Sequence, residues 1–190
     1  MPSIPVFTVA VAALLKIERP GPRRIAGVVA ATAGAIVMLN PAEFSLASDT
    51  VLGNLLILGN ALAYAAFLVL QRPLLERLPW RTLIAWSFLW GGGGVLVVAT
   101  PSLVRLDWGA VSTGAWWGVA YVALLATTLG YLLSTWAVRR SSPLLVAAYT
   151  TLQPLASTVL AVLWLGETVG TKEVVGFVPI TAGLLGVSRR

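Results

Sequence analysis

Two groups of polar side chains lie in otherwise apolar stretches and could bind an uncharged solute through hydrogen bonds. The first group precedes a proline: Tyr149, Thr150 and Gln153 come just before Pro154. A proline within a helix removes a backbone hydrogen bond and bends the helix, which leaves polar groups available at the bend. We therefore expect a binding site at a kinked helix. The alternative is that these side chains hydrogen-bond a neighbouring helix.

The second group is aromatic and hydroxylic. Thr128 and Tyr131 are three residues apart and share one face of a helix. Tyr64 and Trp90, in two other apolar stretches, would add aromatic walls to a cavity with few polar groups. Packing within the protein, or contact with lipid, is the alternative for each aromatic ring.

Several kinds of chemistry are excluded by composition. The chain has no cysteine and no histidine, which removes thiol redox chemistry, Cys/His zinc sites and Ser-His or Cys-His nucleophile pairs. No charged residue lies deep in an apolar stretch, so a proton-coupling carboxylate is not evident. We expect no enzyme activity, no metal and no cofactor.

The apolar content indicates a membrane protein. Hydrophobic residues make up 58% of the chain and charged residues only 11%, with a mean hydropathy of +0.89. A soluble fold cannot hide that much apolar surface, whereas lipid lets apolar side chains face outward. The net charge of +6 comes from residues scattered between apolar runs, so we expect no nucleic-acid partner.

Seven uncharged stretches are candidates for membrane helices. The last stretch is short for a membrane span, and the first stretch is interpreted as part of a helix. The helix in 82–104 is expected to end before Pro101. The seven stretches are residues 1–15, 25–42, 50–71, 82–104, within 108–138, within 141–166, and 174–188.

Basic residues alternate between the intervening loops. The first, third and fifth loops and the C-terminal tail hold 11 Lys and Arg residues, and the other three loops hold two. Because cytoplasmic loops are rich in Lys and Arg, this bias predicts a cytoplasmic C-terminus.

An internal repeat connects the two ends of the chain. Residues 5–34 align without a gap to residues 154–183, at an offset of 149. The charge bias gives the two copies opposite directions across the membrane, and inverted repeats are common in secondary transporters. The matching pairs are Pro5 with Pro154, Glu18 with Glu167, Gly27 with Gly176, and Gly34 with Gly183.

These residues form a pattern that resembles a known family. A kinked helix leads to Leu165-Gly166-Glu167 and then to a helix with two glycines seven residues apart. The pattern resembles the EamA-type half of the drug/metabolite transporter superfamily. The resemblance implies an all-α membrane bundle of ten helices in two inverted five-helix halves. Lys16-Ile17-Glu18 departs from the Leu-Gly-Glu pattern.

The resemblance implies a division of the chain. Residues 1–39 would be the last two helices of a first repeat, 40–49 a linker, and 50–190 a complete second repeat. We expect three helices of the first repeat to be absent and the first segment to start inside a helix. Reading the DNA upstream of Met1 would tell a misplaced start from a real fragment.

The repeated residues have expected structural roles. Pro5 and Pro154 would kink their helices. Glu18 and Glu167 would organise the turn into the next helix, in preference to contacting a solute. The four repeated glycines, Gly27, Gly34, Gly176 and Gly183, would allow close helix packing.

The expected function is transport of small metabolites or drug-like solutes by alternating access between inverted repeats. The alternative is a truncated fragment that transports nothing. The expected partners are a small-molecule solute and the lipid bilayer, with either a homodimer or a chain that supplies the missing helices. The expected location is a bacterial plasma (inner) membrane.

Overall fold

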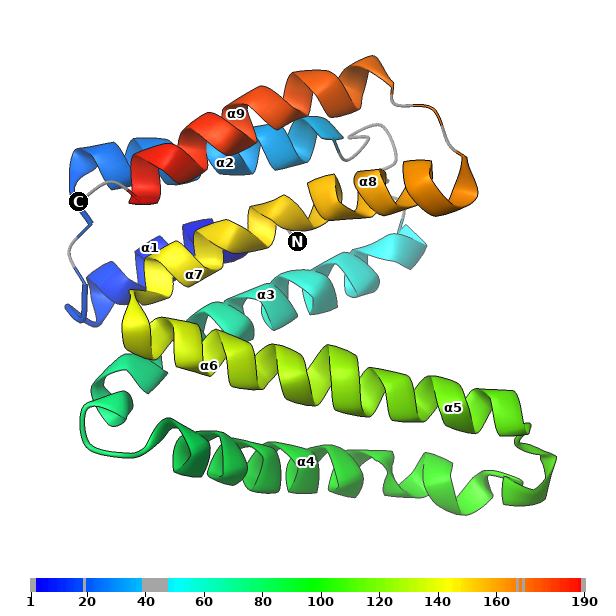
Figure 1. Ribbon diagram of the computed structural model, residues 1–190. Coiled ribbons are helices and arrows are strands. Elements are labelled where there is room, and N and C mark those ends of the chain that lie inside the picture. Colours follow the sequence, from blue (N-terminus) through cyan, green and yellow to red (C-terminus); the bar gives the residue numbers. More distant parts are fainter. Residues whose placement is uncertain (1–2, 19, 39–47, 167, 169, 189–190) are drawn as a thin grey trace. The chain divides into compact units, whose positions relative to one another are not determined.

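Every regular element that the structure describes is helical (Figure 1). The computed structural model describes residues 3–18, 20–38, 48–166, 168 and 170–188. The all-α prediction is therefore confirmed for this part of the chain. The elements are α1 (Ile4–Leu14), α2 (Pro22–Met38), α3 (Ser48–Leu75), α4 (Trp80–Arg105), η2 (Trp108–Ala110), α5 (Thr113–Tyr121), η3 (Val122–Leu129), α6 (Gly130–Arg140), α7 (Pro143–Tyr149), η4 (Thr150–Leu152), α8 (Gln153–Leu165) and α9 (Thr171–Ser188).

Four of the described helical stretches are long and apolar enough to cross a membrane. Two shorter apolar helices, Ile4–Leu14 and Val174–Ser188, accompany them. Only 6% to 17% of each apolar window is buried within the protein, so most of these side chains face outward, as apolar side chains can in a lipid bilayer. The four stretches are Val51–Leu75, Trp80–Arg105, Thr113–Arg140 and Pro143–Leu165.

The helix α4 does not end before Pro101, as its sequence predicted, but continues to Arg105. Proline removes one backbone donor, which leaves the carbonyl of Val97 without its usual partner. The neighbouring hydroxyl of Thr100 donates to the carbonyl of Leu96 at 2.7 Å. Lipid strongly favours helix over any irregular backbone, and membrane helices therefore tolerate proline.

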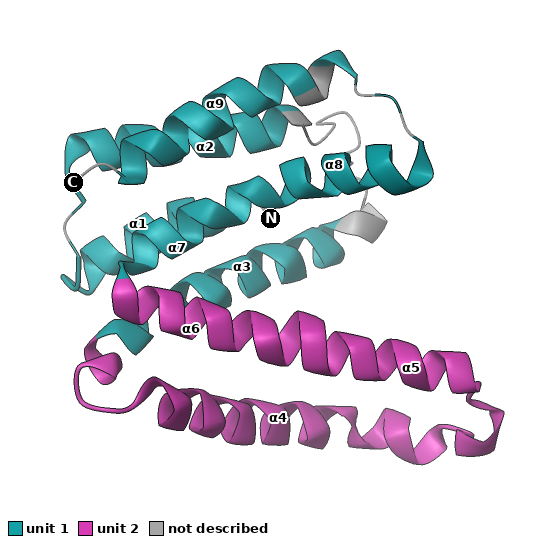
Figure 2. Ribbon diagram, in the orientation of Figure 1, with its two compact units in different colours: residues 1–72, 141–190 teal, residues 73–140 magenta. Residues whose placement is uncertain are grey.

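The chain forms two compact units, each described here by itself (Figure 2). The first unit contains residues 1–72 and 141–190, and the second contains residues 73–140. The first unit therefore joins both ends of the chain, and the second is a single continuous segment.

In the first unit, α2 and α9 lie side by side (Figure 1). A Cβ atom added at Gly27 would lie 2.6 Å from the carbonyl oxygen of Gly183, and one at Gly34 would lie 2.7 Å from the carbonyl oxygen of Gly176. The two helix backbones therefore touch at both positions. Only glycine permits this approach, which is how small residues bring membrane helices together.

The two glycine contacts are reciprocal with respect to the sequence repeat. Gly27 is the repeat equivalent of Gly176, and Gly34 is the equivalent of Gly183. Each glycine of α2 packs against the non-equivalent glycine of α9. Reciprocal contacts of this kind are those expected where a two-fold axis relates two copies of a motif.

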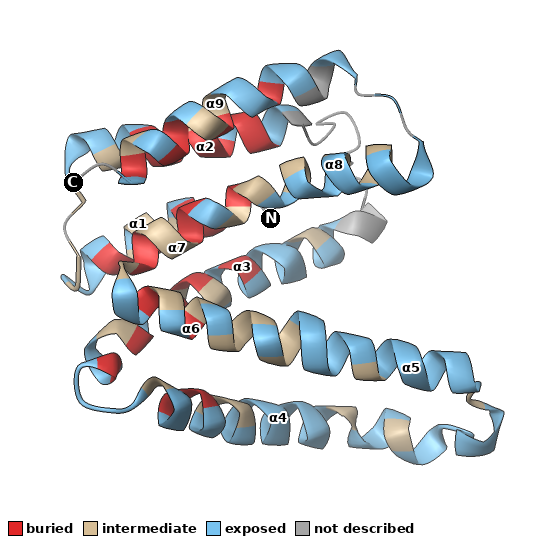
Figure 3. Ribbon diagram, viewed as in Figure 1, coloured by how far each residue is buried: buried red, intermediate tan, exposed pale blue. Residues whose placement is uncertain are grey.

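The buried core of the first unit gathers around this contact. Figure 3 shows buried positions on α2, α7 and α9, whereas α4 and α5 are largely exposed. Small side chains such as Ala35 and Ala148 let the helices approach closely. The core cluster consists of Val28, Ala35, Leu144, Ala148, Ile180, Leu184 and Val187.

The stretch Pro143–Leu165 is broken in its middle. The helix α7 begins at Pro143 and is capped by Ser142, whose side chain accepts from the backbone N–H of Leu145 at 3.3 Å. The 3-10 turn η4 then interrupts the helix, and Pro154 occupies the first turn of α8. The break therefore lies directly before Pro154. Pro5 likewise lies in the first turn of its helix, α1, and is buried.

The turn after α1 contains a lysine with an unusual backbone conformation. Lys16 has a φ of 56°, in the left-handed region that favours glycine. Its N–H bonds the carbonyl of Ala13 at 3.2 Å, and the N–H of Ile17 bonds that of Ala12 at 3.1 Å, which is a Schellman motif. The turn after α8 places Gly166, with a φ of 67°, at the left-handed position.

The second unit is a helical hairpin. The helix α4 contacts α6, and the continuous stretch of α5, η3 and α6 returns beside it (Figure 2). Ser112 caps α5 by accepting from the backbone N–H of Ala115 at 3.2 Å. Trp108 and Trp116 stack at the tip, with ring centroids 6.0 Å apart.

Candidate functional site

A cavity of about 710 Å³ that is widely open to the surface lies in the second unit, and we take it as the candidate site. Small residues of α5, such as Ala115 and Gly118, leave space between this helix and α4. The cavity has no charged lining residue, and its polar side chains are the two threonine hydroxyls. Its lining residues are Phe88, Ala115, Gly118, Val119, Val122, Ala123, Thr127 and Thr128.

The two threonines lie in η3, a π-helix. The hydroxyl of Thr128 donates to the carbonyl of Ala123, five residues earlier, at 2.7 Å. This spacing follows from the wider turn of a π-helix, which is rare and frequent at functional sites. Thr127 is half-buried on the same wall. Together they give an apolar cavity two hydrogen-bonding groups for orienting a solute.

An aromatic pair lies beside the cavity. The rings of Phe88 and Tyr131 meet edge to face, with centroids 5.7 Å apart and planes at 62°. Such pairs contribute about 0.5–1.5 kcal/mol beyond the area that they bury. The structure therefore brings the predicted residues Thr128 and Tyr131 to one region, through the shared neighbour Phe88.

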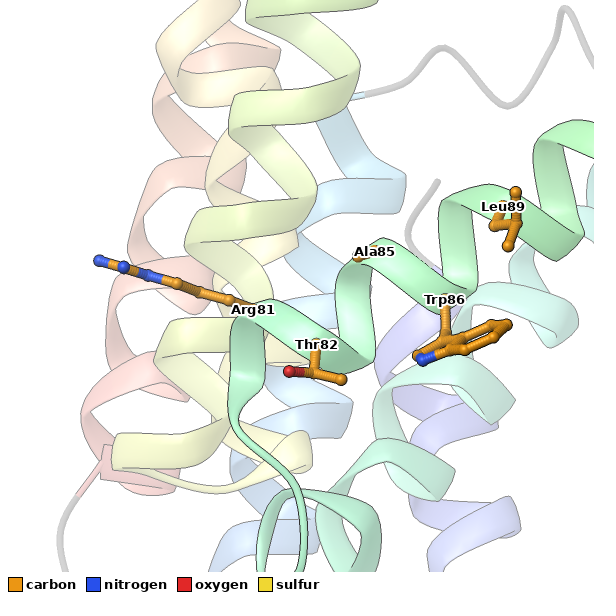
Figure 4. A pocket seen from close by; sticks show the side chains of 5 residues that line it. All are labelled: Arg81, Thr82, Ala85, Trp86 and Leu89. Carbon is orange, nitrogen blue, oxygen red and sulfur yellow. The ribbon is translucent and has the colours of Figure 1, made fainter.

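Trp90 does not line this cavity, and 75% of its surface is exposed. A second hollow of about 500 Å³ runs along α4 and is lined by five residues of that helix (Figure 4). It starts at the charged end, at Arg81, and reaches Leu89. Its lining residues are Arg81, Thr82, Ala85, Trp86 and Leu89.

The polar side chains before Pro154 are partly exposed and partly hydrogen-bonded within their own helix. The hydroxyl of Thr150 donates to the carbonyl of Ala147 at 2.7 Å, so its proton is used within its own helix. Tyr149 and Gln153 are exposed. Tyr64, on α3, is half-buried and stacks on Phe67 with centroids 6.3 Å apart. The binding role of these four residues remains a prediction.

Glu18 contacts the next helix through a side chain. Its Oε1 accepts from Arg24 Nη1 at 3.0 Å, in the first turns of α2. Its Oε2 is buried and has no hydrogen-bond partner among the described residues. Glu18 therefore contacts α2 through an ion pair between side chains. Glu167 lies outside the described residues.

The sequence did not predict the π-helix or the contribution of Phe88 to the cavity. Thr127 and Thr128 are ordinary residues for a membrane helix, and no local signal marks a π-turn. Ala115 and Gly118 belong to the wall of the cavity and Gly114 directly precedes it, and the spacing of these small residues was the available signal. No group of three or more metal-ligating side chains occurs in the described part of the chain.

Comparison with known proteins identifies relatives in plants and bacteria. The chain is 30% identical over 207 residues to a WAT1-related protein of Arabidopsis thaliana, covering 96% of this chain and 54% of the relative. It is 26% identical to the protein WALLS ARE THIN 1 of the same plant, over 96% of this chain and 56% of the relative. It is 28% identical to a probable terminal-alkyne amino-acid exporter of Streptantibioticus cattleyicolor, over 98% and 61%.

The chain thus spans little more than half the length of most of these curated relatives. No solved structure matches it significantly. The profile of the EamA-like transporter family matches residues 51–189, nearly three quarters of the chain. This match includes the second copy of the repeat, residues 154–183, and confirms the predicted resemblance. The chain belongs to the EamA-like transporter family.

Proposed function

We propose that the protein moves small, uncharged or amphipathic solutes across a membrane by alternating access between two inverted repeats. The observation that carries this proposal is the reciprocal packing of Gly27 on Gly183 and of Gly34 on Gly176. This packing supports a local two-fold axis between α2 and α9 that relates two oppositely oriented copies, and inverted copies can exchange an outward-open for an inward-open state.

We propose that the described helices are the last seven of a ten-helix arrangement. A comparison of α1 with its repeat equivalent α8 supports this. On α1, Ile4, Pro5, Thr8 and Ala12 are buried, and α1 contacts α7. The equivalent face of α8 is exposed or half-buried: Gln153, Pro154, Ser157 and Ala161. In a complete two-fold arrangement, a helix equivalent to α7 covers that face.

The cavity of the second unit is the proposed solute contact. Its uncharged walls favour an apolar or aromatic moiety, and the hydroxyls of Thr127 and Thr128 favour a hydrogen-bonding group beside it. One relative is named as a probable exporter of a terminal-alkyne amino acid. We propose neutral amino acids and molecules of similar polarity as the first solutes to test.

Transport is tested with the purified chain in proteoliposomes. The probes are radiolabelled neutral amino acids, including L-propargylglycine, which carries a terminal alkyne. We expect saturable flux that Thr127→Val reduces several-fold, because the substitution keeps the shape and removes the hydroxyl. Thr100→Val is the matched control, since Thr100 is exposed on α4 and lies outside the cavity.

Two outcomes would count against the proposal. A folded chain that neither binds nor moves any solute of the panel would favour the non-transporting fragment. Equal flux through Thr127→Val and Thr100→Val would place the solute elsewhere.

The proposed orientation has a separate test. The chain lacks cysteine, so single cysteines can be placed at exposed positions in two loops. We expect Ala110→Cys to react with a membrane-impermeant maleimide from outside the cell, and Leu78→Cys to react only after permeabilisation. The opposite pattern would reverse the orientation that the loop charges predict.

A further inference from the structure

Two arginine–tryptophan pairs lie at one end of the helical hairpin. The guanidinium of Arg81 lies 5.4 Å from the ring centroid of Trp80, and that of Arg140 lies 5.5 Å from the ring centroid of Trp136. Both distances are within the range of a cation–π contact. Trp80 begins α4 and Arg140 ends α6, and these helices are antiparallel neighbours (Figure 2). Both pairs therefore lie at the same end.

This end is strongly basic. Arg77 and Arg139 join Arg81 and Arg140 at this end. The only acidic residue of the loop between α3 and α4 is Glu76, so the five residues carry a net charge of +3. All four arginines are exposed. No carboxylate among the described residues forms an ion pair with them. Their charge is therefore available to an external anion.

The opposite end of the hairpin provides an internal comparison. It carries Arg105 and Asp107 and has no net charge. Its two tryptophans, Trp108 and Trp116, stack on each other instead of on arginine. Tryptophan marks a membrane–water interface at both ends, but net positive charge accumulates at only one.

The hollow along α4 starts at this basic end (Figure 4). Arg81 and Thr82 form its polar end, and Ala85, Trp86 and Leu89 form its apolar continuation. Eight residues of helix separate Arg81 from Leu89, or about 12 Å along the axis. A hollow that is cationic at the membrane surface and apolar below it complements a phospholipid with an anionic headgroup and an apolar acyl chain.

We propose that the basic end of the hairpin, defined by Trp80, Arg81, Trp136 and Arg140, is a binding site for an anionic phospholipid. Arg81 and Arg140 bind headgroup phosphates, and an acyl chain lies along the hollow of α4. Basic pockets at the cytoplasmic ends of membrane helices recognise anionic headgroups by the same charge complementarity. A zwitterionic phospholipid satisfies the shape of the hollow and not its charge.

The test is lipid binding to the purified, delipidated chain in detergent. The probes are dioleoylphosphatidylglycerol, dioleoylphosphatidylcholine and glycerol 3-phosphate, and the measurements are native mass spectrometry and the thermal unfolding midpoint. We expect phosphatidylglycerol to be retained preferentially and to raise the midpoint. Glycerol 3-phosphate, which has the phosphate and no acyl chain, is expected to have little effect.

The variant that tests the site is Arg81→Gln, and Arg105→Gln is its matched control on the same helix. We expect Arg81→Gln to weaken phosphatidylglycerol binding about fivefold, as removal of one basic residue at a membrane surface does. Arg105→Gln is expected to bind as the unchanged protein does. Trp80→Leu keeps every charge and removes the ring under Arg81, which gives a second variant if Arg81→Gln does not fold.

Three results would overturn the proposal. Equal retention of phosphatidylglycerol and phosphatidylcholine would show that headgroup charge is not recognised. Equal losses in Arg81→Gln and Arg105→Gln would reduce the effect to overall charge. Stabilisation by glycerol 3-phosphate as large as that by the lipid would identify a site for soluble phosphate compounds.

Discussion

Gly27 and Gly183 are in backbone contact: a Cβ atom at Gly27 would lie 2.6 Å from the carbonyl oxygen of Gly183. These two residues are 156 positions apart in the chain and belong to different copies of the repeat. Their contact holds α2 against α9 and, with the second contact between Gly34 and Gly176, fixes the register of the two helices.

Substitution of either glycine in the first contact should separate the helices. We expect Gly27→Ala to cost about 1–3 kcal/mol, the usual effect of overfilling a packed interface. Gly183→Ala should cost a similar amount. The double variant should cost less than the sum of the two, because the first methyl group already separates the backbones. Unfolding in detergent micelles measures all three.

Gly92→Ala is the matched control for these variants. Gly92 lies inside α4, and a Cβ atom there would meet nothing within 4 Å. Alanine favours a helix over glycine by about 1 kcal/mol, so the control should be neutral or stabilising. A loss of stability in Gly92→Ala equal to that in Gly27→Ala would contradict the packing argument.

Lys16 is expected to limit the stability of the turn after α1. Its φ of 56° places a side chain in a conformation that costs a non-glycine residue about 1–2 kcal/mol. We expect Lys16→Gly to raise the thermal unfolding midpoint. Lys16→Ala removes the same charge and keeps the strain, so it should give no gain. A gain of the same size in both variants would point to charge instead of backbone conformation.

The ion pair between Arg24 and Glu18 should stabilise the same turn. Arg24→Met leaves a largely buried carboxylate without its partner, because Oε2 already lacks one among the described residues. We expect a loss of about 1–3 kcal/mol. Arg23→Met, at the exposed neighbour, should have little effect. Combining Arg24→Met with Glu18→Gln should recover part of the loss, and a double variant worse than Arg24→Met would contradict this account.

Gln71 should be replaceable at a gain in stability. Its side chain is 2% exposed, and neither Nε2 nor Oε1 has a hydrogen-bond partner in the described part of the chain. Gln71→Met keeps the length and removes two buried polar atoms, so the unfolding midpoint should rise. Gln153→Met, at an exposed glutamine of α8, should leave it unchanged. Destabilisation by Gln71→Met would show that the side-chain amide of Gln71 forms hydrogen bonds in the folded protein.

The departure of Lys16-Ile17-Glu18 from Leu-Gly-Glu has a direct structural consequence. In the second copy the left-handed residue is Gly166, whose repeat equivalent is Ile17. Isoleucine is β-branched and avoids this conformation. The first copy therefore turns one residue earlier, at Lys16. The departure from Leu-Gly-Glu thus indicated that the turn of the first copy differs. It did not indicate which residue would adopt the left-handed conformation.

The sequence by itself determined the helical class, the approximate spans and the repeat, because these depend on apolar length and on the order of residues along the chain. The break in Pro143–Leu165 lies directly before Pro154, and a kink at this proline remains a prediction. The π-helix at Val122–Leu129, the continuation of α4 through Pro101 and the cavity beside Phe88 were decided by the tertiary structure. They depend on which helices meet and at what distance. The glycine contacts show both contributions: the repeat identified the four residues, and only the packing of α2 on α9 decided that Gly27 pairs with Gly183 and not with its own equivalent.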